Sequence, residues 1–261
     1  MIFCSLYSGS SGNCTFVASH NTKILVDAGM PGKSIENALK SINECPSEID
    51  AILVTHEHID HIKGVGILSR KYDIPIYAKL PTWNAMANSI GKIKDYNIKV
   101  IDSSFMSIND MDITNYEIPH DAASPCGYSI CSGSKKVCIA TDLGYFSEEV
   151  KDAIKDADVI LLESNHDVEM LKSGPYPYTL KRRILSDTGH LSNEACGNAI
   201  VNITNEKHKT VILGHMSKIN NYPELAYQTV INILNKNGIA IHKDMTLGIA
   251  KRDFPSSYID F

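Results

Sequence analysis

The chain has 261 residues, of which 43% are hydrophobic and 21% charged, and its formal net charge is −5. This composition is ordinary for a soluble globular protein, and no apolar run approaches the length of a transmembrane helix. The negative charge excludes a global basic field, so a polyanionic substrate would need a local basic patch or metal ions.

The seven cysteines are odd in number and form no CxxC pair. This pattern argues against a disulfide framework and a zinc ribbon, and it indicates a reducing compartment. The amino terminus, MIFCSLYSGSSGN, lacks the basic region of a signal peptide. We therefore expect a cytoplasmic protein that is not bound to a membrane.

The first part of the chain alternates apolar, β-branched runs with turn residues and with segments of helical periodicity. The runs predict strands at 2–7, 14–19, 23–29, 51–55 and 75–78. Helices are predicted at 32–44 and 64–72, and Pro81 can open a third, because a proline at a helix start loses no hydrogen bond.

Short strands then dominate, and helices and strands alternate after them. The predicted strands are 98–101, 105–108, 111–118, 127–131, 136–141, 158–164, 210–215 and 239–244. The predicted helices are 147–156, a stretch around 177–186, 193–203 and 223–238. Two groups of strands with helices on their flanks predict an α/β fold with two packed sheets, a four-layer αββα sandwich. Because no long linker or repeat interrupts the chain, we expect a single domain over residues 1–261.

The segment THEHIDH at 55–61 follows the predicted strand 51–55 and contains His56, His58, Asp60 and His61. Residues two apart share a side in an extended segment but not in a helix, so a common side requires a strand end or loop. In α/β folds, ligands bind where strands end. Imidazole and carboxylate together suit zinc, manganese or iron, so the cluster predicts a metal site. The alternative is a solvated polar loop with incidental histidines.

Four other polar residues stand where predicted strands end. They are Asp27, His120, Asp142 and His215, and each follows an apolar run. Taken alone, each could be an ordinary turn or capping residue. Their recurrence in one setting supports a shared site.

The motifs VDAG, THEHIDH, IPH, ATD and GH, in this order, resemble the five motifs of the metallo-β-lactamase superfamily. The resemblance covers nearly the whole chain and implies the αββα sandwich, with a site of two divalent metal ions (Zn²⁺ or Mn²⁺, with Fe²⁺ also possible) at one edge of the sheets. It implies that a first metal is held by His56, His58 and His120, a second by Asp60, His61 and His215, and that Asp142 bridges them. Asp27 would orient the histidine loop from outside the ligand set. A water between the metals would act as the nucleophilic hydroxide.

The branch within the superfamily is indicated by other segments. Common β-lactamases carry Cys where this chain has Asp142 and lack a histidine equivalent to His61. The chain after His215 is too short for the helical domain of hydroxyacyl-glutathione hydrolases, and no β-CASP insertion fits between Asp142 and His215. SGSSGN at 8–13, ESNHD at 163–167, RILSDTGHLSN at 183–193 and LGHMSKINN at 213–221 resemble the bacterial YycJ/WalJ group. That resemblance implies a 5′-to-3′ exonuclease on double-stranded DNA.

His190 precedes a predicted helix for which Ser192 is a suitable N-cap. It could contact a phosphate oxygen or protonate a leaving oxygen. His190 and the predicted metal ligand Asp60 are our candidate catalytic residues. The alternative for His190 is a purely structural hydrogen bond at the helix start. The candidate substrate contacts are Ser10, Ser11, Asn13, Asn165, His166, Arg182 and Arg183. Their alternatives are a flexible hairpin loop for the first three, a loop at the strand end for the next two, and a solvated helix face for the arginines.

The sequence thus predicts a dinuclear metal-dependent phosphodiesterase with DNA as its substrate. No residue pattern identifies a protein partner. Two alternatives stay open. One is a hydrolase of small molecules, such as a cyclic phosphodiesterase or thioesterase, on the same metal site. The other is a non-enzymatic metal-binding or redox-sensing protein.

Overall fold

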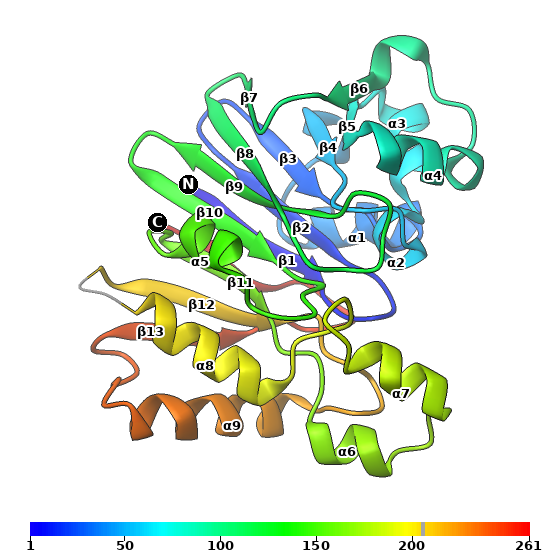
Figure 1. Cartoon of the computed structure of the whole chain (residues 1–261). Coiled ribbons are helices and arrows are strands. Elements are labelled where there is room, and N and C mark those ends of the chain that lie inside the picture. The colour runs from blue at the N-terminus through cyan, green and yellow to red at the C-terminus, as the bar shows by residue number, and fades with distance from the viewer. Residues whose placement is uncertain (205–206) are drawn as a thin grey trace.

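The structure is a computed structural model and describes residues 1–204 and 207–261. Within these residues two seven-stranded sheets pack face to face, and helices cover their outer faces (Figure 1). The predicted αββα sandwich is therefore confirmed. None of the helices in the described ranges is long and apolar enough to cross a lipid bilayer.

The first sheet is built from the amino-terminal strands and one strand from the end of the chain. Its order is β14 (Ser256–Asp260), β1 (Ile2–Tyr7), β2 (Cys14–Ala18), β3 (Lys23–Val26), β4 (Ala51–Leu53), β5 (Ile76–Lys79) and β6 (Ile98–Ile101). The strands from β14 to β3 pair antiparallel, and those from β3 to β6 pair parallel.

The second sheet repeats this division into an antiparallel and a parallel half. Its order is β13 (Met245–Ile249), β12 (Lys209–Gly214), β11 (Val159–Glu163), β10 (Lys135–Ala140), β9 (Cys126–Ser132), β8 (Met111–Glu117) and β7 (Phe105–Ile108). β10 to β13 are parallel, while β7 to β10 are antiparallel.

Alternation along the strands divides the interior into three layers, because successive side chains of a strand point to opposite faces. On β11, Val159 and Leu161 enter the core between the sheets, and Ile160 and Leu162 face the outer helices. Because both faces of such a strand are buried, its sequence is an almost continuous apolar run.

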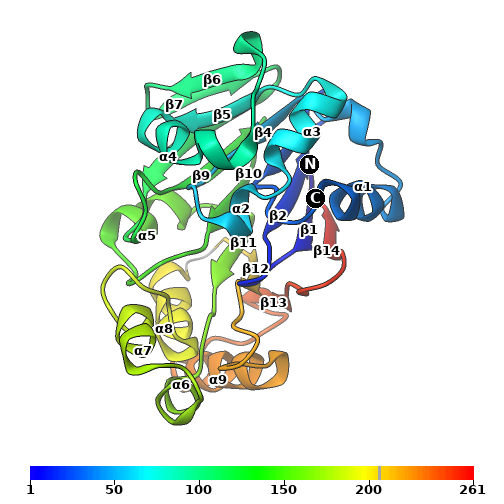
Figure 2. The same cartoon turned by 90° about the vertical axis from the view of Figure 1, so that its right-hand side faces the viewer.

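The helices divide between the two outer faces and the site edge (Figure 2). On the first sheet lie α1 (Gly32–Ser41), α3 (Val65–Tyr72) and α4 (Leu80–Ile90), and on the second α5 (Glu148–Ile154), α8 (Asn193–Ile203) and α9 (Pro223–Lys236). The short helices α2 (Ile59–Ile62), α6 (Val168–Ser173) and α7 (Tyr178–Ile184) belong to connections, and η1 (Pro46–Glu48) and η2 (Asp95–Asn97) are single 3₁₀ turns. Pro81 lies in the first turn of α4, as predicted.

Two details at the carboxy-terminal end differ from the prediction. The predicted strand 239–244 is wrong: Ile239 N–H donates to Leu234 O at the end of α9, and Asp244 N–H donates to Ala240 O in a turn. The strand is instead β13, which follows directly. The last strand, β14, was not predicted, and it crosses back to pair with β1 of the first sheet.

Candidate metal centre

The predicted ligand-type residues converge at the carboxyl ends of the parallel strands. Asp27 follows β3, Asp142 follows β10, and His215 follows β12. These three residues have positive φ angles of 60°, 62° and 53°, in the left-handed region that non-glycine residues rarely adopt. Such strain persists only where surrounding structure enforces it, and it concentrates at functional sites.

The histidine loop is extended only in its first part. His56 and His58 lie in the loop after β4, whereas Asp60 and His61 lie in α2. The expectation of an extended or looped segment therefore holds for His56 and His58 and is wrong for Asp60. A turn of helix brings Asp60 and His61 back beside the loop. Gly29 permits this close approach, because a Cβ there would lie 1.6 Å from the carbonyl oxygen of Asp60.

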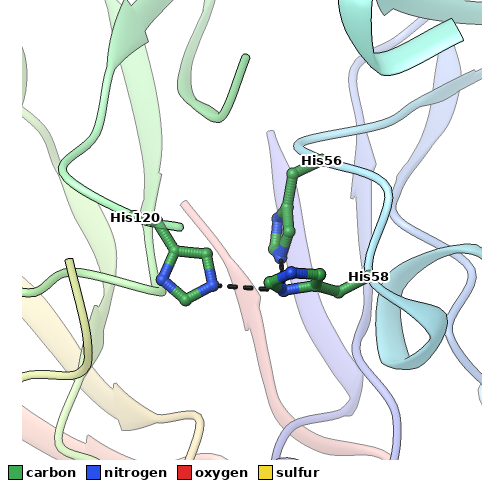
Figure 3. A group of neighbouring side chains, drawn as sticks. All are labelled: His56, His58 and His120. Carbon is green, nitrogen blue, oxygen red and sulfur yellow. Dashed lines mark hydrogen bonds between the residues drawn. The ribbon is translucent and has the colours of Figure 1, made fainter. Parts of the chain in front are cut away.

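His56, His58 and His120 form a first cluster, in which His120 approaches from the loop after β8 (Figure 3). Nδ1 of His58 lies 3.1 Å from Nε2 of His56 and 3.2 Å from Nε2 of His120. A tetrahedral ion about 2.0–2.1 Å from each nitrogen separates its ligands by about 3.3 Å. The three nitrogens therefore have the spacing of metal ligands.

A second cluster lies beside the first and contains carboxylates. Oδ2 of Asp60 lies 3.6 Å from Nε2 of both His61 and His215, and Oδ2 of Asp142 lies 3.4 Å from Nε2 of His61. Asp142 Oδ2 and His215 Nε2 are buried and have no hydrogen-bond partner within the described ranges. Buried polar atoms are rarely left unpaired, so these atoms fit a bound cation. Asp142 Oδ1 lies 3.8 Å from His120 Nε2, between the clusters.

Outer acceptors set the orientation of three histidines. Nδ1 of His61 lies 2.8 Å from Asp27 Oδ2, Nδ1 of His215 lies 2.7 Å from Glu163 Oε1, and Nδ1 of His120 lies 3.1 Å from Gly189 O. Carboxylate and carbonyl oxygens only accept, so each Nδ1 carries the hydrogen. The Nε2 lone pairs therefore face the clusters, as metal binding requires.

Asp27 also holds the backbone of the histidine loop. Its carboxylate accepts hydrogen bonds from Thr55 N at 2.8 Å and from Thr55 Oγ1 at 2.9 Å, besides the one from His61. This is the geometry expected of a residue that orients the loop from outside the ligand set.

The two clusters differ in their electrostatics. Burial lowers the pKa of His56 well below its ordinary value, and the neighbouring histidines lower it further. Burial also opposes a charge on His61, but Asp142, Asp27 and Asp60 outweigh it and raise the pKa of His61 to about 9. His56 thus offers a neutral lone pair, and the second cluster gathers negative charge that would stabilise a cation.

Glu163, the last residue of β11, lies at the site and was not among the predicted site residues. Its fully buried Oε1 lies 2.9 Å from Nδ1 of His190 and also contacts His215. Burial alone would raise the pKa of Glu163, but the two histidines hold it below its ordinary value. Its position in the sequence could have indicated this role, because Glu163 stands at the end of an apolar strand, and Asp27 and Asp142 stand just after the ends of theirs.

A pocket of about 340 Å³ opens over the clusters, and His58, Asp60, Asp142, His190 and His215 line it. His190 donates from Nδ1 to Glu163, so its Nε2 remains available to a bound molecule. The site can therefore place a proton donor or acceptor beside the side chains that could hold metal ions.

The predicted substrate contacts divide into two groups. Ser10, Asn165 and Arg183 line the pocket, with Arg183 paired to Asp121. The remaining four do not line it. Ser11 is exposed, Arg182 stacks on Tyr178 on the outside of α7, Asn13 is buried and donates to Asp60 and His61, and His166 is buried with no partner for either ring nitrogen in the described part of the chain.

Comparison with known proteins gives the same fold. The family model of the metallo-beta-lactamase superfamily matches residues 7–215 of this chain. The chain is 42% identical to exodeoxyribonuclease YycJ of Bacillus anthracis over 240 residues, which cover 92% of this chain and 91% of that protein. It is 43% identical to exodeoxyribonuclease WalJ of Streptococcus pneumoniae serotype 2 over 242 residues, covering 92% and 90%.

Solved structures agree with this assignment at the level of the fold. Zn²⁺-bound PqqB from Methylobacterium extorquens superposes with a TM-score of 0.72 at 15% identity, covering 98% of this chain and 99% of that one. The short form of human tRNase Z gives a TM-score of 0.64 at 15% identity over 100% of both chains. By its sequence match and its fold, this chain belongs to the metallo-beta-lactamase superfamily.

Proposed function

We propose that this chain is a metal-dependent exodeoxyribonuclease that degrades double-stranded DNA from its 5′ end. The observation that carries the proposal is the pairing of two metal-type clusters with the His190–Glu163 pair in one pocket. The relatives named exodeoxyribonucleases support DNA as the substrate, since they match this chain over more than nine tenths of its length.

The proposed metal ligands are those that the resemblance implied. They are His56, His58 and His120 for one ion, Asp60, His61 and His215 for another, and Asp142 between them. Divalent ions bound there, Zn²⁺ or Mn²⁺ with Fe²⁺ as an alternative, would lower the pKa of water and neutralise negative charge on a phosphodiester. The nitrogen spacing and the unpartnered atoms of Asp142 and His215 support this assignment.

His190 is the residue that we assign to proton transfer. In its protonated form it donates from Nε2 to the leaving oxygen, while Nδ1 keeps its hydrogen bond to Glu163. The buried carboxylate of Glu163 fixes the orientation of the ring. Asp60 acts as a ligand that also faces the pocket.

Arg183, Ser10 and Asn165 are the substrate contacts that the pocket favours. Arg183 can offer guanidinium hydrogens to a phosphate if it shares or exchanges its partner Asp121. Asn165 Nδ2 donates to His215 O at 2.8 Å, which fixes the side chain beside a proposed ligand. A local cation such as Arg183 is what a chain with a net charge of −5 needs near a phosphodiester.

A hydrolase of small esters is the second candidate, because a pocket of about 340 Å³ has the size of a small-molecule site. A salt titration separates the two functions. Binding of DNA releases counterions, so DNA turnover should fall steeply as salt is added, whereas turnover of a small ester should change little.

Digestion of a duplex labelled at either the 5′ or the 3′ end, with Mn²⁺ added, tests the proposal. We expect early release of 5′-terminal nucleotide by the wild type and none by Asp142→Ala or His58→Ala. Early release from the 3′ end would contradict the proposed polarity. An intact duplex, in a preparation that hydrolyses bis(p-nitrophenyl) phosphate, would exclude DNA as the substrate and keep the metal site.

A further inference from the structure

A second pocket, of about 560 Å³, lies next to the candidate metal centre. Three segments form it: the loop that begins at Ser8, the connection from β12 to α9, and the connection from β13 to β14. Ser217 lines both pockets. A chain-like ligand that leaves the metal clusters over Ser217 therefore reaches the second pocket directly.

Hydrogen bonds hold the wall between the two pockets in place. His215 N–H donates to Ser8 Oγ at 2.8 Å, and Arg252 Nη2 donates to Met216 O at 2.6 Å. Gly9 packs on the same arginine, since a Cβ there would lie 2.7 Å from Arg252 Nη1. The second pocket is thus fixed relative to His215, which also lines the metal pocket.

The second pocket combines aromatic rings with cations. The rings of Tyr222 and Phe254 are 49% and 52% exposed. Lys251 Nζ lies 4.7 Å from the centroid of Phe254, and neither Lys251 nor Lys218 forms an ion pair with any residue in the described ranges. Exposed rings beside free ammonium groups are the features that bind single-stranded nucleic acid, in which bases stack and phosphates need cations.

The charge of the lining also favours a phosphate-bearing ligand. Two exposed carboxylates, Glu224 and Asp253, line the pocket together with three cations, Lys218, Lys251 and Arg252. The balance is positive although the whole chain carries −5. An acidic ligand is therefore better accommodated here than on the protein surface in general.

We propose that this second pocket binds an unpaired nucleotide of the DNA strand whose scissile phosphate lies at the metal clusters. A base stacks on Phe254, whose ring lies beside Lys251, and the adjoining phosphate contacts Lys218 and Lys251. The inference rests on the proposed function. It adds that the strand must separate from its complement, because the metal pocket has only the size of a small-molecule site.

The test compares two substrates, a duplex with a short 5′ overhang and bis(p-nitrophenyl) phosphate, for Phe254→Ala and for the double variant Lys218→Ala/Lys251→Ala. We expect the ratio of kcat/KM for DNA to kcat/KM for the ester to fall about tenfold in Phe254→Ala. In the lysine variant, the slope of log(kcat/KM) for DNA against log(salt) should become shallower by about two. 2-Aminopurine in the overhang should lose its stacking-dependent change in fluorescence in Phe254→Ala.

Lys94 and Tyr96 provide a matched control. Lys94 Nζ lies 5.3 Å from the ring centroid of Tyr96, which is 58% exposed. They lie next to β6, at the opposite end of the molecule from α9 (Figures 1 and 2). Tyr96→Ala should leave the substrate ratio unchanged. If Phe254→Ala is unstable by its melting temperature, Phe254→Leu keeps an apolar side chain without an aromatic face and should lower the ratio equally.

The outcomes separate the two proposals. If the wild type digests DNA and every variant keeps its substrate ratio and salt slope, the pocket does not bind the strand, and the proposed function stands. That result would leave an acidic protein partner as the better occupant. If the wild type cleaves only the ester, the proposed function fails, and the inference that depends on it is overturned with it.

Discussion

Replacing Glu163 with Gln should weaken metal binding and turnover together. This one carboxylate positions both His215, a proposed metal ligand, and His190, the residue that we assign to proton transfer. Oε1 accepts hydrogen bonds from Nδ1 of His215 at 2.7 Å and of His190 at 2.9 Å. Oε2 accepts from the backbone N–H of Leu143 at 2.6 Å and of Leu191 at 3.0 Å. Both oxygens are thus acceptors of two bonds. An amide NH₂ at either position would face two donors.

The magnitude follows from the two hydrogen bonds that the amide cannot accept. Each bond to a charged group contributes about 1.5–3 kcal/mol net, so their loss costs about 3–6 kcal/mol. Removing a buried charge recovers part of its desolvation cost, so we expect the free energy of unfolding to fall by about 3 kcal/mol. His215 also loses the acceptor that orients its ring, and such losses reduce metal affinity about 10- to 100-fold.

The assay is a metal titration in competition with a chromophoric chelator, combined with kcat on a labelled duplex at saturating metal. A lower kcat that persists at saturating metal would report the misplaced His190. Glu36→Gln is the matched control, because Glu36 is a buried carboxylate on α1 that accepts a hydrogen bond from Lys71 at 2.7 Å, outside the site. Wild-type metal affinity and kcat in Glu163→Gln would refute the positioning role.

Three further predictions concern the metals, the arginines and acid stability. Zn²⁺ or Mn²⁺ at about 100 times its dissociation constant should stabilise the fold by about 2.7 kcal/mol per site. In a thermal melt this corresponds to a rise in Tm of about 5–10 °C, which EDTA should reverse. An equal rise in Asp142→Ala would show that the ion binds elsewhere. Arg183→Ala should lower kcat/KM on DNA about tenfold or more, and Arg182→Ala by less, because only Arg183 lines the pocket; equal effects would show that the charge acts at long range. Burial lowers the pKa of His166 to about 4. The unfolded chain therefore binds a proton that the fold excludes, and stability is lost as the pH falls from about 6.5 towards 4, by up to about 3 kcal/mol. Denaturant unfolding at pH 7.5 and 4.5 should show that His166→Gln removes this loss, and an unchanged pH dependence would contradict a neutral buried ring.

Most of the fold could be predicted because its strands are buried on both faces. Runs such as 159–162 are continuously apolar, and the intervening helices show their own periodicity. The weakest signals came from the last part of the chain. The segment 239–244 has the composition of a strand, but its backbone donors serve the end of α9 and a turn. The edge strand β14 has little buried apolar surface by which it could be recognised.

The sequence by itself determined the chemical types at the site and their position at strand ends, because metal ligation limits the usable side chains and parallel strands bring their carboxyl ends to one edge. The tertiary structure alone decided which neighbours act together. In the sequence, Glu163 is simply the polar residue at the end of a strand. Only the packing of β11 beside β12 places its carboxylate against His215 and His190. Likewise, Arg182 and Arg183 are adjacent in sequence, but neighbouring positions on a helix point in different directions, so only Arg183 lines the pocket.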